Sequence, residues 1–110
     1  MPVVTVAIAP HDAERDLLAR VADAVAHALE LAPGDVIAMS LPVRETVVNG
    51  AGADAVATPW ALIGIHGSDR GAQRMRRACE AARDAATDWS RRHAAEQEGV
   101  WCEWLLPQRP

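Results

Sequence analysis

The sequence predicts an α+β fold in which two tandem β-α-β units form a four-stranded sheet with two helices on one face. Short runs rich in β-branched residues alternate with longer segments whose apolar residues recur every three or four positions. The run near the N-terminus is echoed by a second run that begins at Pro59. Two right-handed crossovers place both helices on the same side of one sheet, which gives a two-layer sandwich.

The first unit begins with a strand expected over residues 3–9, VVTVAIA. Pro10-His11-Asp12 interrupts this run and supplies a candidate N-cap for a helix that begins near Ala13. The predicted core face of this helix consists of Leu17, Leu18, Val21, Val25, Ala28 and Leu29. Pro33-Gly34 is expected to end the helix, and residues 35–41 read as a second strand.

A linker is expected over residues 49–58, because the stretch NGAGADAVATP is rich in glycine and alanine and has neither a helical nor a strand period. It divides the chain into a first unit, residues 1–48, and a second unit, residues 59–110. A chain of 110 residues that is 50% hydrophobic suffices for one core. We therefore expect a single domain over residues 1–110.

The second unit repeats the pattern of the first. Three of its residues match three of the first strand at a constant offset: Pro59, Ile63 and Ile65 match Pro2, Val6 and Ile8. Ser68 or Asp69 is the candidate N-cap of a longer helix. The predicted core face of that helix consists of Met75, Cys79, Ala82, Ala86 and Trp89. Gly99 opens a last strand that closes with Leu106-Pro107, as the first unit closes with Leu41-Pro42.

The same order of elements also occurs in ferredoxin-like sandwiches, which interleave their strands into an antiparallel sheet. The tandem repeat favours two self-contained units instead. Because each unit leaves a sheet edge open, we expect symmetric assembly to cover the exposed edges.

Composition argues against several classes of partner. The net charge is −4 and all 11 basic residues are arginine, so no basic face for nucleic acid is expected. No apolar stretch reaches the roughly 20 residues of a membrane span, and no secretion signal precedes the first strand, so we expect a cytoplasmic protein.

Cys79 and Cys102 lack metal-binding spacing and are expected to be two buried thiols, and the four histidines are scattered. No metal is expected.

Pro2 has two interpretations. A proline at the start of a strand stands where its missing N–H does least harm. If Met1 is removed, however, Pro2 carries a free secondary amine. Free α-amines titrate near neutrality, at about 7.7 to 8, so such an amine acts as a base or an acid near pH 7.

A duplicated β-α-β chain that begins Met-Pro and runs directly into a strand resembles the tautomerase superfamily, whose members use an amino-terminal proline as the catalytic group. The segments IHGSDRGAQR and VWCEW are most similar to the cis-3-chloroacrylic acid dehalogenase branch. The resemblance implies a cofactor-independent enzyme that binds a small carboxylate-bearing substrate. It also implies a homotrimer with active sites near the subunit contacts.

The catalytic residues implied by the resemblance are Pro2, freed of Met1, and Glu103. Glu103 lies where the dehalogenase pattern has a tyrosine, and a carboxylate there would orient water or act as a second acid-base group. The dehalogenase carries a further carboxylate beyond its last strand that has no counterpart in this sequence. Hydrolytic dehalogenation by the usual route of that branch is therefore not expected unless Glu103 or Glu45 substitutes.

The substrate-binding residues implied by the resemblance are Arg70, Arg74, His27 and Trp101. Arg70 matches the first arginine after His66-Gly67, and its planar fork suits a carboxylate. The second arginine falls at Gln73 without a gap and at Arg74 with one inserted residue, and we select Arg74. His27 lies near the end of the first helix.

Further side chains of the second unit are assigned by strand alternation. Trp101 shares a strand face with Glu103 and would shape an apolar pocket. Trp104 is expected on the other face, against a helix. His66 alternates away from Ile63 and Ile65 and is assigned a structural role.

These residues predict a tautomerase or isomerase that moves a proton on a small 2-oxo or 2-hydroxy-dienoic acid, with Pro2 as the general base. One alternative is a hydratase, dehalogenase or decarboxylase of a small unsaturated or oxo acid. The other is a trimeric small-molecule binding protein without catalytic activity.

Overall fold

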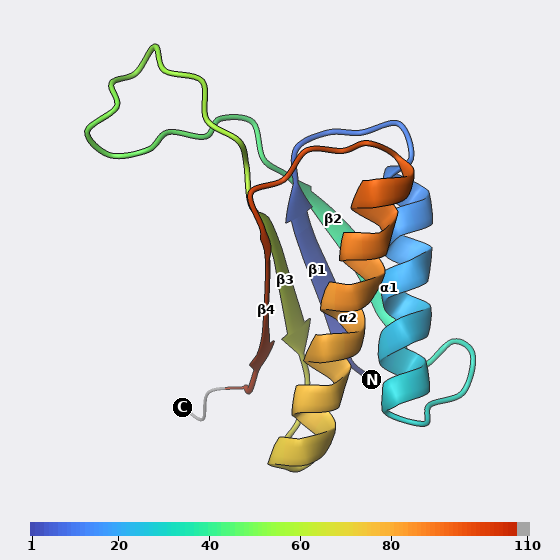
Figure 1. Cartoon of the computed structure of the whole chain (residues 1–110). Helices are drawn as coiled ribbons and strands as arrows, with labels where there is room; N and C mark the ends of the chain where they lie inside the picture. The colour runs from blue at the N-terminus through green and yellow to red at the C-terminus, as the bar shows by residue number, and fades with distance from the viewer. Residues whose placement is uncertain (108–110) are drawn as a thin grey trace.

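Six elements follow one another in the predicted order, in a computed structural model that describes residues 1–107 (Figure 1). The first unit contains strand β1 (Val3–Ile8), helix α1 (Glu14–Ala28) and strand β2 (Ile37–Pro42). The second unit contains strand β3 (Ala61–His66), helix α2 (Ala72–Arg92) and strand β4 (Val100–Leu105). The predicted α+β class with two β-α-β units is confirmed.

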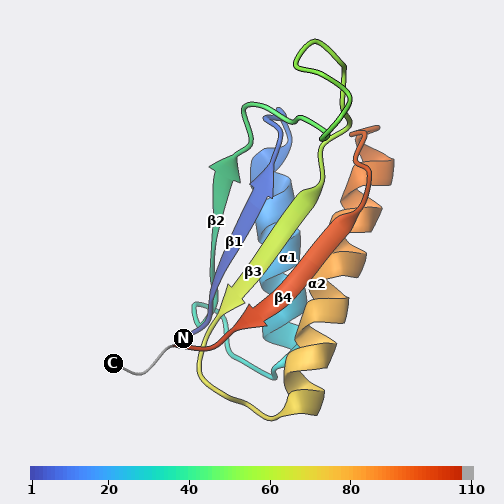
Figure 2. The ribbon, with the colours of Figure 1, turned by 90° about the vertical axis from the view of Figure 1, so that its left-hand side faces the viewer.

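The four strands form one mixed sheet in the order β2-β1-β3-β4. Each unit contributes a parallel pair, and the two units meet where β1 and β3 run antiparallel. This arrangement excludes the interleaved antiparallel sheet of a ferredoxin-like sandwich. Both helices cover the same face (Figure 1), and Figure 2 views the sheet from the face without helices, which we call the open face.

The internal repeat extends through the helices. Adding 57 to the residue number takes Val4, Val6 and Ile8 of β1 to Ala61, Ile63 and Ile65 of β3, and all six are buried. The same shift takes Val21, Val25 and Leu29 to Ala78, Ala82 and Ala86, which are also buried. The two units therefore place equivalent positions in one shared core.

The predicted equivalence of the two Leu-Pro endings is wrong. Leu41 lies opposite Ala7 of β1, and the counterpart of Ala7 in β3, Gly64, lies opposite Glu103. Position 41 of β2 thus corresponds to position 103 of β4 and not to position 106. α2 has 21 residues and α1 has 15, and the offset between equivalent positions is larger in the last strands than in the first strands. It is nevertheless three residues smaller than the offset that the Leu-Pro echo suggests.

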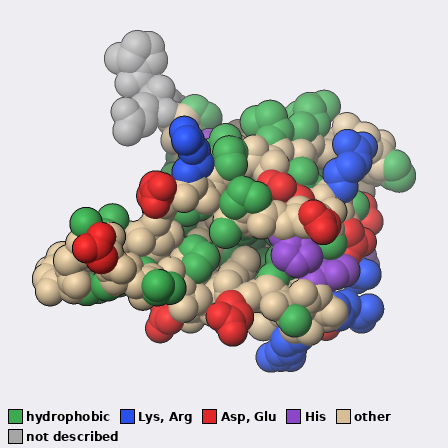
Figure 3. Space-filling view, turned by 90° about the horizontal axis from the view of Figure 1, so that it is seen from above, with side chains coloured by type: hydrophobic (Ala, Val, Ile, Leu, Met, Phe, Trp, Pro, Cys, Tyr) green, Lys and Arg blue, Asp and Glu red, His purple; other side chains and the backbone are tan. Residues whose placement is uncertain are grey.

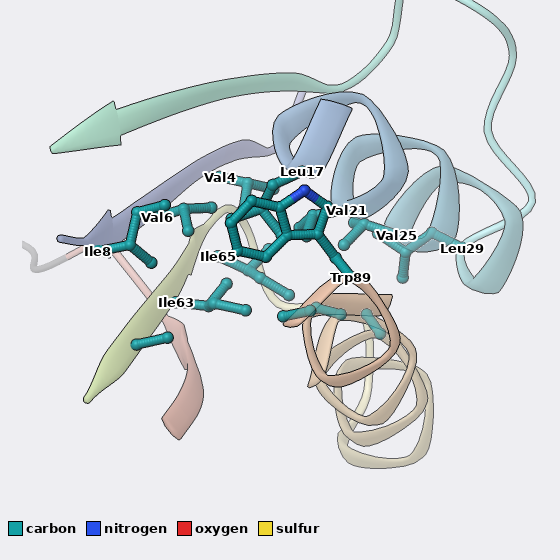
Figure 4. Packing of buried hydrophobic residues seen from close by; sticks show 14 residues of the cluster. Val4, Val6, Ile8, Leu17, Val21, Val25, Leu29, Ile63, Ile65 and Trp89 are labelled. Atoms are coloured by element: carbon teal, nitrogen blue, oxygen red, sulfur yellow. The ribbon is translucent and has the colours of Figure 1, made fainter. Parts of the chain in front are cut away.

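Trp89 is the largest fully buried side chain of the core, and Figure 4 shows it against Leu17 and Val21 of α1. Its indole Nε1 donates a hydrogen bond to the carbonyl oxygen of Ala13 at 3.1 Å. The end of α2 is thereby tied to the start of α1. On the preceding turns of α2 the buried residue is Ala78 and not the predicted Cys79, and small side chains there allow the two helices to approach closely.

Neither predicted N-cap is formed. α1 starts after Ala13 without a side-chain cap, and the Ala13 N–H donates to Nδ1 of His11 at 3.0 Å. α2 starts after Gly71, which has φ 87°, and the Asp69 carboxylate accepts from the Gly71 N–H at 2.8 Å. The Asp69 carboxylate closes a local turn instead of capping the helix, so α2 begins three residues after it.

Two loop expectations differ in detail from the structure. α1 ends at Ala28, before the Pro33-Gly34 pair that was expected to end it. Residues 43–60 contain no helix or strand and project beyond the end of the sheet (Figures 1 and 2), so the irregular segment is longer than the linker expected at residues 49–58. Val56 at its tip is fully exposed. Within residues 1–107, neither helix combines the length and hydropathy that crossing a membrane requires.

We predict that Trp89→Ala lowers the free energy of unfolding by about 3–5 kcal/mol, because it opens a cavity in the core. Trp89→Phe should cost about 1–2 kcal/mol, because it keeps a ring and loses the bond to Ala13. Urea denaturation at one fixed protein concentration measures both. The control is Arg92→Ala, which breaks an exposed 2.8 Å pair with Asp88 and should cost less than about 0.5 kcal/mol. Equal stability of Trp89→Ala and Arg92→Ala would contradict the packing role.

Candidate functional site

The start of β1, the end of β3, the end of β4 and the start of α2 lie at one end of the molecule, which we call the Pro2 end (Figure 1). The register places Val3 opposite His66, and His66 opposite Leu105. The Pro2 carbonyl oxygen accepts a hydrogen bond from the Ile37 N–H at 3.3 Å, which holds the first residues of the chain to β2.

A cavity of about 450 Å³ opens at the Pro2 end. Its lining residues are Met1, His66, Gly67, Ser68, Leu105, Leu106 and Pro107. The Pro2 ring is buried, whereas Met1 is 70% exposed. The Met1 carbonyl carbon is bonded to the Pro2 nitrogen, so Pro2 adjoins a residue that lines the cavity.

Trp104 holds the loop that leads from the cavity to Arg70. Its indole Nε1 donates to the Gly67 carbonyl oxygen at 3.3 Å. A Cβ atom at Gly67 would lie 2.9 Å from the Trp104 ring, so only glycine allows this close approach. Trp104 packs on the helix-covered side of the sheet, as the strand alternation predicts.

The three predicted basic binding residues lie on segments of the Pro2 end. Nε of Arg70 is buried and has no hydrogen-bond partner among the described residues. Arg74 lies on the first turn of α2, and its guanidinium is 3.6 Å from the exposed Glu30 carboxylate. His27 is exposed on the last turn of α1, three residues before Glu30. A buried guanidinium nitrogen without a partner is an uncommon feature in a folded protein and favours an anion as the missing partner.

Trp101 and Glu103 lie on the open face and not at the Pro2 end. Trp101 is opposite Leu62, and Glu103 is opposite Gly64. With a rise of about 3.3 Å per residue, these positions are about 13 Å and about 7 Å along the sheet from His66. The Trp101 indole lies 3.5 Å from the Glu103 carboxylate and also borders a separate hollow of about 350 Å³ with Trp60 and Arg83. One chain therefore does not bring Trp101 to Pro2.

The open face is largely apolar. Its exposed side chains include Ile37, Met39, Leu41, Leu62, Trp101 and Leu105. A shallow hollow of about 370 Å³ runs across it between β2 and β4. Large exposed apolar side chains on three of the four strands, β2, β3 and β4, give this face the character of an interface.

His66 of the Pro2 end points away from the core, as strand alternation predicts. Its imidazole is exposed on the open face, borders the cavity and shares a hydrogen bond of 3.1 Å with Oγ1 of Thr5. Sequence reasoning did not include His66 among the site residues, because alternation away from Ile63 and Ile65 does not by itself indicate a ligand site. The structural role assigned to His66 stays a prediction.

The opposite end of the helices carries a second group of aromatic side chains. The His11 ring packs edge-on against Trp89 at 4.9 Å between centroids, and the His93 ring is 5.3 Å from Trp89. Figure 3, viewed from this end, shows histidine side chains side by side. His93 also lies 3.5 Å from the Asp16 carboxylate. Within residues 1–107 no three His, Cys, Asp or Glu side chains converge as a metal site.

Cys79 and Cys102 are free and half-buried between α2 and β4, and their thiols face one another. Burial raises the pKa of both thiols above the ordinary value. Neutral thiols are poor nucleophiles, so the structure does not favour either cysteine as a catalytic group.

A scan against protein-family models and a search of curated proteins found no match to this sequence. Solved structures do match over nearly the whole chain. A fused 4-OT, described as a wild-type symmetric trimer, has 20% identity and a TM-score of 0.68, with 98% of this chain and 85% of that chain covered.

Two further matches extend the comparison. A structure of malonate semialdehyde decarboxylase, described with decarboxylase and hydratase activities, has 14% identity and a TM-score of 0.68, covering 96% of this chain and 84% of that chain. Macrophage migration inhibitory factor of Toxoplasma gondii has 18% identity and a TM-score of 0.64, covering 97% of this chain and 89% of that chain. The chain has the fold of the tautomerase superfamily.

Proposed function

We propose that this chain is a cofactor-independent tautomerase or isomerase that moves a proton on a small 2-oxo or 2-hydroxy-dienoic acid. One observation supports the proposal: Met1, whose carbonyl carbon is bonded to the Pro2 nitrogen, borders a cavity at the start of β1, and its removal would turn that nitrogen into a free secondary amine next to the cavity. The resemblance to the cis-3-chloroacrylic acid dehalogenase branch motivates the choice of residues within this superfamily fold.

Pro2 would act as the general base. Free α-amines titrate near neutrality, at about 7.7 to 8, so an N-terminal amine can act as a base near pH 7. The amine takes a proton from an enol hydroxyl or from a carbon next to a carbonyl, and it returns a proton elsewhere on the conjugated system.

Arg70 would hold the substrate carboxylate. The partnerless Nε of Arg70 supports this role, because a carboxylate supplies the acceptor that the described residues do not. Arg74 and His27 would add positive charge at the same end of the molecule. Their charge would also stabilise the negative charge that develops on the enolate.

A homotrimer would complete the site. Within one chain Trp101 and Glu103 lie along the sheet away from Pro2, so their assigned roles require a neighbouring chain. The apolar open face supplies a surface for that contact, since Leu41, Leu62 and Trp101 are each about half exposed. In the proposed assembly three open faces meet, and Trp101 and Glu103 of one chain approach Pro2 of the next.

The second candidate is a hydratase or decarboxylase, with a dehalogenase as a further variant. The observation that favours it is the Glu103 carboxylate, which is exposed on the open face and is suited to orient a water molecule. A pH–rate profile separates the two candidates. A proline that acts as a base loses activity as the pH falls below its pKa, whereas one that acts as an acid loses activity as the pH rises. Retention of Met1 would instead favour a binding protein without catalytic activity.

We predict that the Pro2 nitrogen is the site of reductive trapping by a 2-oxo acid. Because the sequence contains no lysine, the N-terminal amine is the only aliphatic amine of the chain. Pyruvate condenses with a secondary amine to an iminium ion, and cyanoborohydride reduces this ion to a stable adduct. Intact mass and peptide mapping should show one adduct, on a chain that lacks Met1. A native protein that retains Met1 would contradict the proposed mechanism.

We predict that Pro2→Ala lowers turnover of the enol form of an arylpyruvate by about 100-fold or more, because a freely rotating primary amine replaces the secondary amine that the proline ring holds in place. Arg70→Ala should instead raise KM by about 10-fold to 100-fold, because a charge-assisted pair with the carboxylate is lost. Ultraviolet absorbance follows both reactions. Arg76→Ala, an exposed arginine of α2, is the matched control and should leave both parameters unchanged. Unchanged turnover in Pro2→Ala would rule out the assignment.

We predict that Leu62→Glu converts a trimer to monomers, because three carboxylates would be buried in the apolar contact. Light scattering coupled to size exclusion measures the mass directly. Val56→Glu is the matched control, because Val56 is fully exposed on the projecting loop. A wild-type protein that is monomeric, or a Leu62→Glu protein that remains trimeric, would show that the open face is not the contact.

A further inference from the structure

We propose that His66 is a second acid-base group of the candidate site and that Thr5 is its positioning residue. The inference rests on the proposed function, in which Pro2 supplies the first such group. It goes beyond that function, because a tautomerisation removes a proton at one atom of the substrate and adds a proton at another. A second acid-base group near the atom that receives the proton accelerates the reaction.

The strand register brings His66 close to the N-terminus. His66 is opposite Val3, the residue that follows Pro2. Paired residues in an antiparallel ladder have Cα atoms about 4.5 to 5.5 Å apart, and one residue along the strand adds about 3.3 Å. The Cα atoms of Pro2 and His66 are therefore within about 7 Å of each other, which is comparable to the length of a small oxo acid. His66 and Met1, which is bonded to the Pro2 nitrogen, border the same cavity, so a small oxo acid bound there would lie next to both residues.

The orientation of the imidazole depends on Gly64 and Thr5. A Cβ atom at Gly64 would lie 3.2 Å from Nε2 of His66 and 3.1 Å from Oγ1 of Thr5. The missing side chain therefore leaves the space in which the ring reaches the Thr5 hydroxyl at 3.1 Å. Because Thr5 engages Nε2, the nitrogen left for a substrate is Nδ1. The hydrogen bond also fixes the orientation of the ring, whereas an exposed histidine without such a bond rotates freely.

Titratable side chains are sparse around the cavity. Among the described residues that border the cavity, His66 carries the only titratable side chain. Charged residues of neighbouring segments are Asp69 and Arg70 in the following loop and Glu103 on β4, which faces Gly64. Imidazole is the side chain whose ordinary pKa lies near neutral pH, so it both donates and accepts protons there.

The proposed step balances as a simple isomerisation. The neutral Pro2 amine takes the proton of the enol hydroxyl, the O–H bond breaks and the C=O bond forms. The electron pair of the carbon–carbon double bond then takes a proton from the imidazolium of His66 to form a C–H bond. Water carries the proton from the Pro2 ammonium to the neutral imidazole, and both groups return to their starting states.

The test compares His66→Ala with Thr5→Val, with phenylpyruvate enol as the probe. His66→Ala should lower kcat by about 100-fold and leave KM within about twofold, because proton transfer is lost and carboxylate binding by Arg70 is kept. Added imidazole should restore part of the activity, which a merely structural residue would not allow. Thr5→Val should lower kcat by a smaller factor, without a change in KM. His93→Ala, a histidine at the opposite end, is the control and should behave as wild type.

The outcomes separate this inference from the proposed function. If Pro2→Ala loses activity while His66→Ala keeps wild-type kcat, the role of His66 is overturned and the proposed function stands. If His66→Ala loses kcat but imidazole does not restore it and the melting temperature falls, His66 is structural and the inference is again overturned. If the wild type does not convert the enol, both are overturned. Loss of kcat with imidazole rescue at unchanged melting temperature supports the inference.

Discussion

The antiparallel pairing of β1 with β3 is the contact on which the rest of the structure depends. It is the only strand pairing between the two units within residues 1–107, and it makes two sheets of two strands into one sheet of four. Its register places Val4 beside Ile65 and Val6 beside Ile63, all on the helix-covered face. The same ladder places Thr5 and His66 on the open face. Core and candidate site are therefore set by a single register, in which a slip of one residue would exchange the two faces.

Periodicity was sufficient for the elements and for most of the core. The spacing of Leu17, Val21 and Val25 predicts the buried stripe of α1, and strand alternation separates Trp104 from Trp101 correctly. Features that depend on contacts between elements distant in the sequence could not be predicted from periodicity. The predicted Asp12 cap does not form; His11 instead accepts a hydrogen bond from the Ala13 N–H, and its ring packs against Trp89 of the other unit. Cys79 and Cys102 meet only because α2 lies over β4, and their separation in sequence does not indicate it.

The location of several candidate residues was predicted, whereas their roles stay predictions. Sequence reasoning placed the N-terminal proline and three basic residues on segments that the fold brings to one end, since all of them flank strand or helix ends. It also grouped Trp101 and Glu103 with Pro2, and a single chain keeps them apart along β4. Residue spacing carries no information about which copy of a chain supplies a side chain. His66 was placed outward correctly, but strand alternation alone does not distinguish a structural histidine from one that borders a cavity.

The repeat relates Pro2 to Pro59 across the β1–β3 ladder, and the two prolines consequently lie at opposite ends of the sheet. Only one of them can ever be a chain terminus, because Pro59 nitrogen is fixed in a peptide bond. A duplicated scaffold of this kind gives each molecule two geometrically related corners with unequal chemistry. The corner around Trp60 needs no free amine. Its residues can therefore be substituted without affecting the N-terminal amine at the other corner.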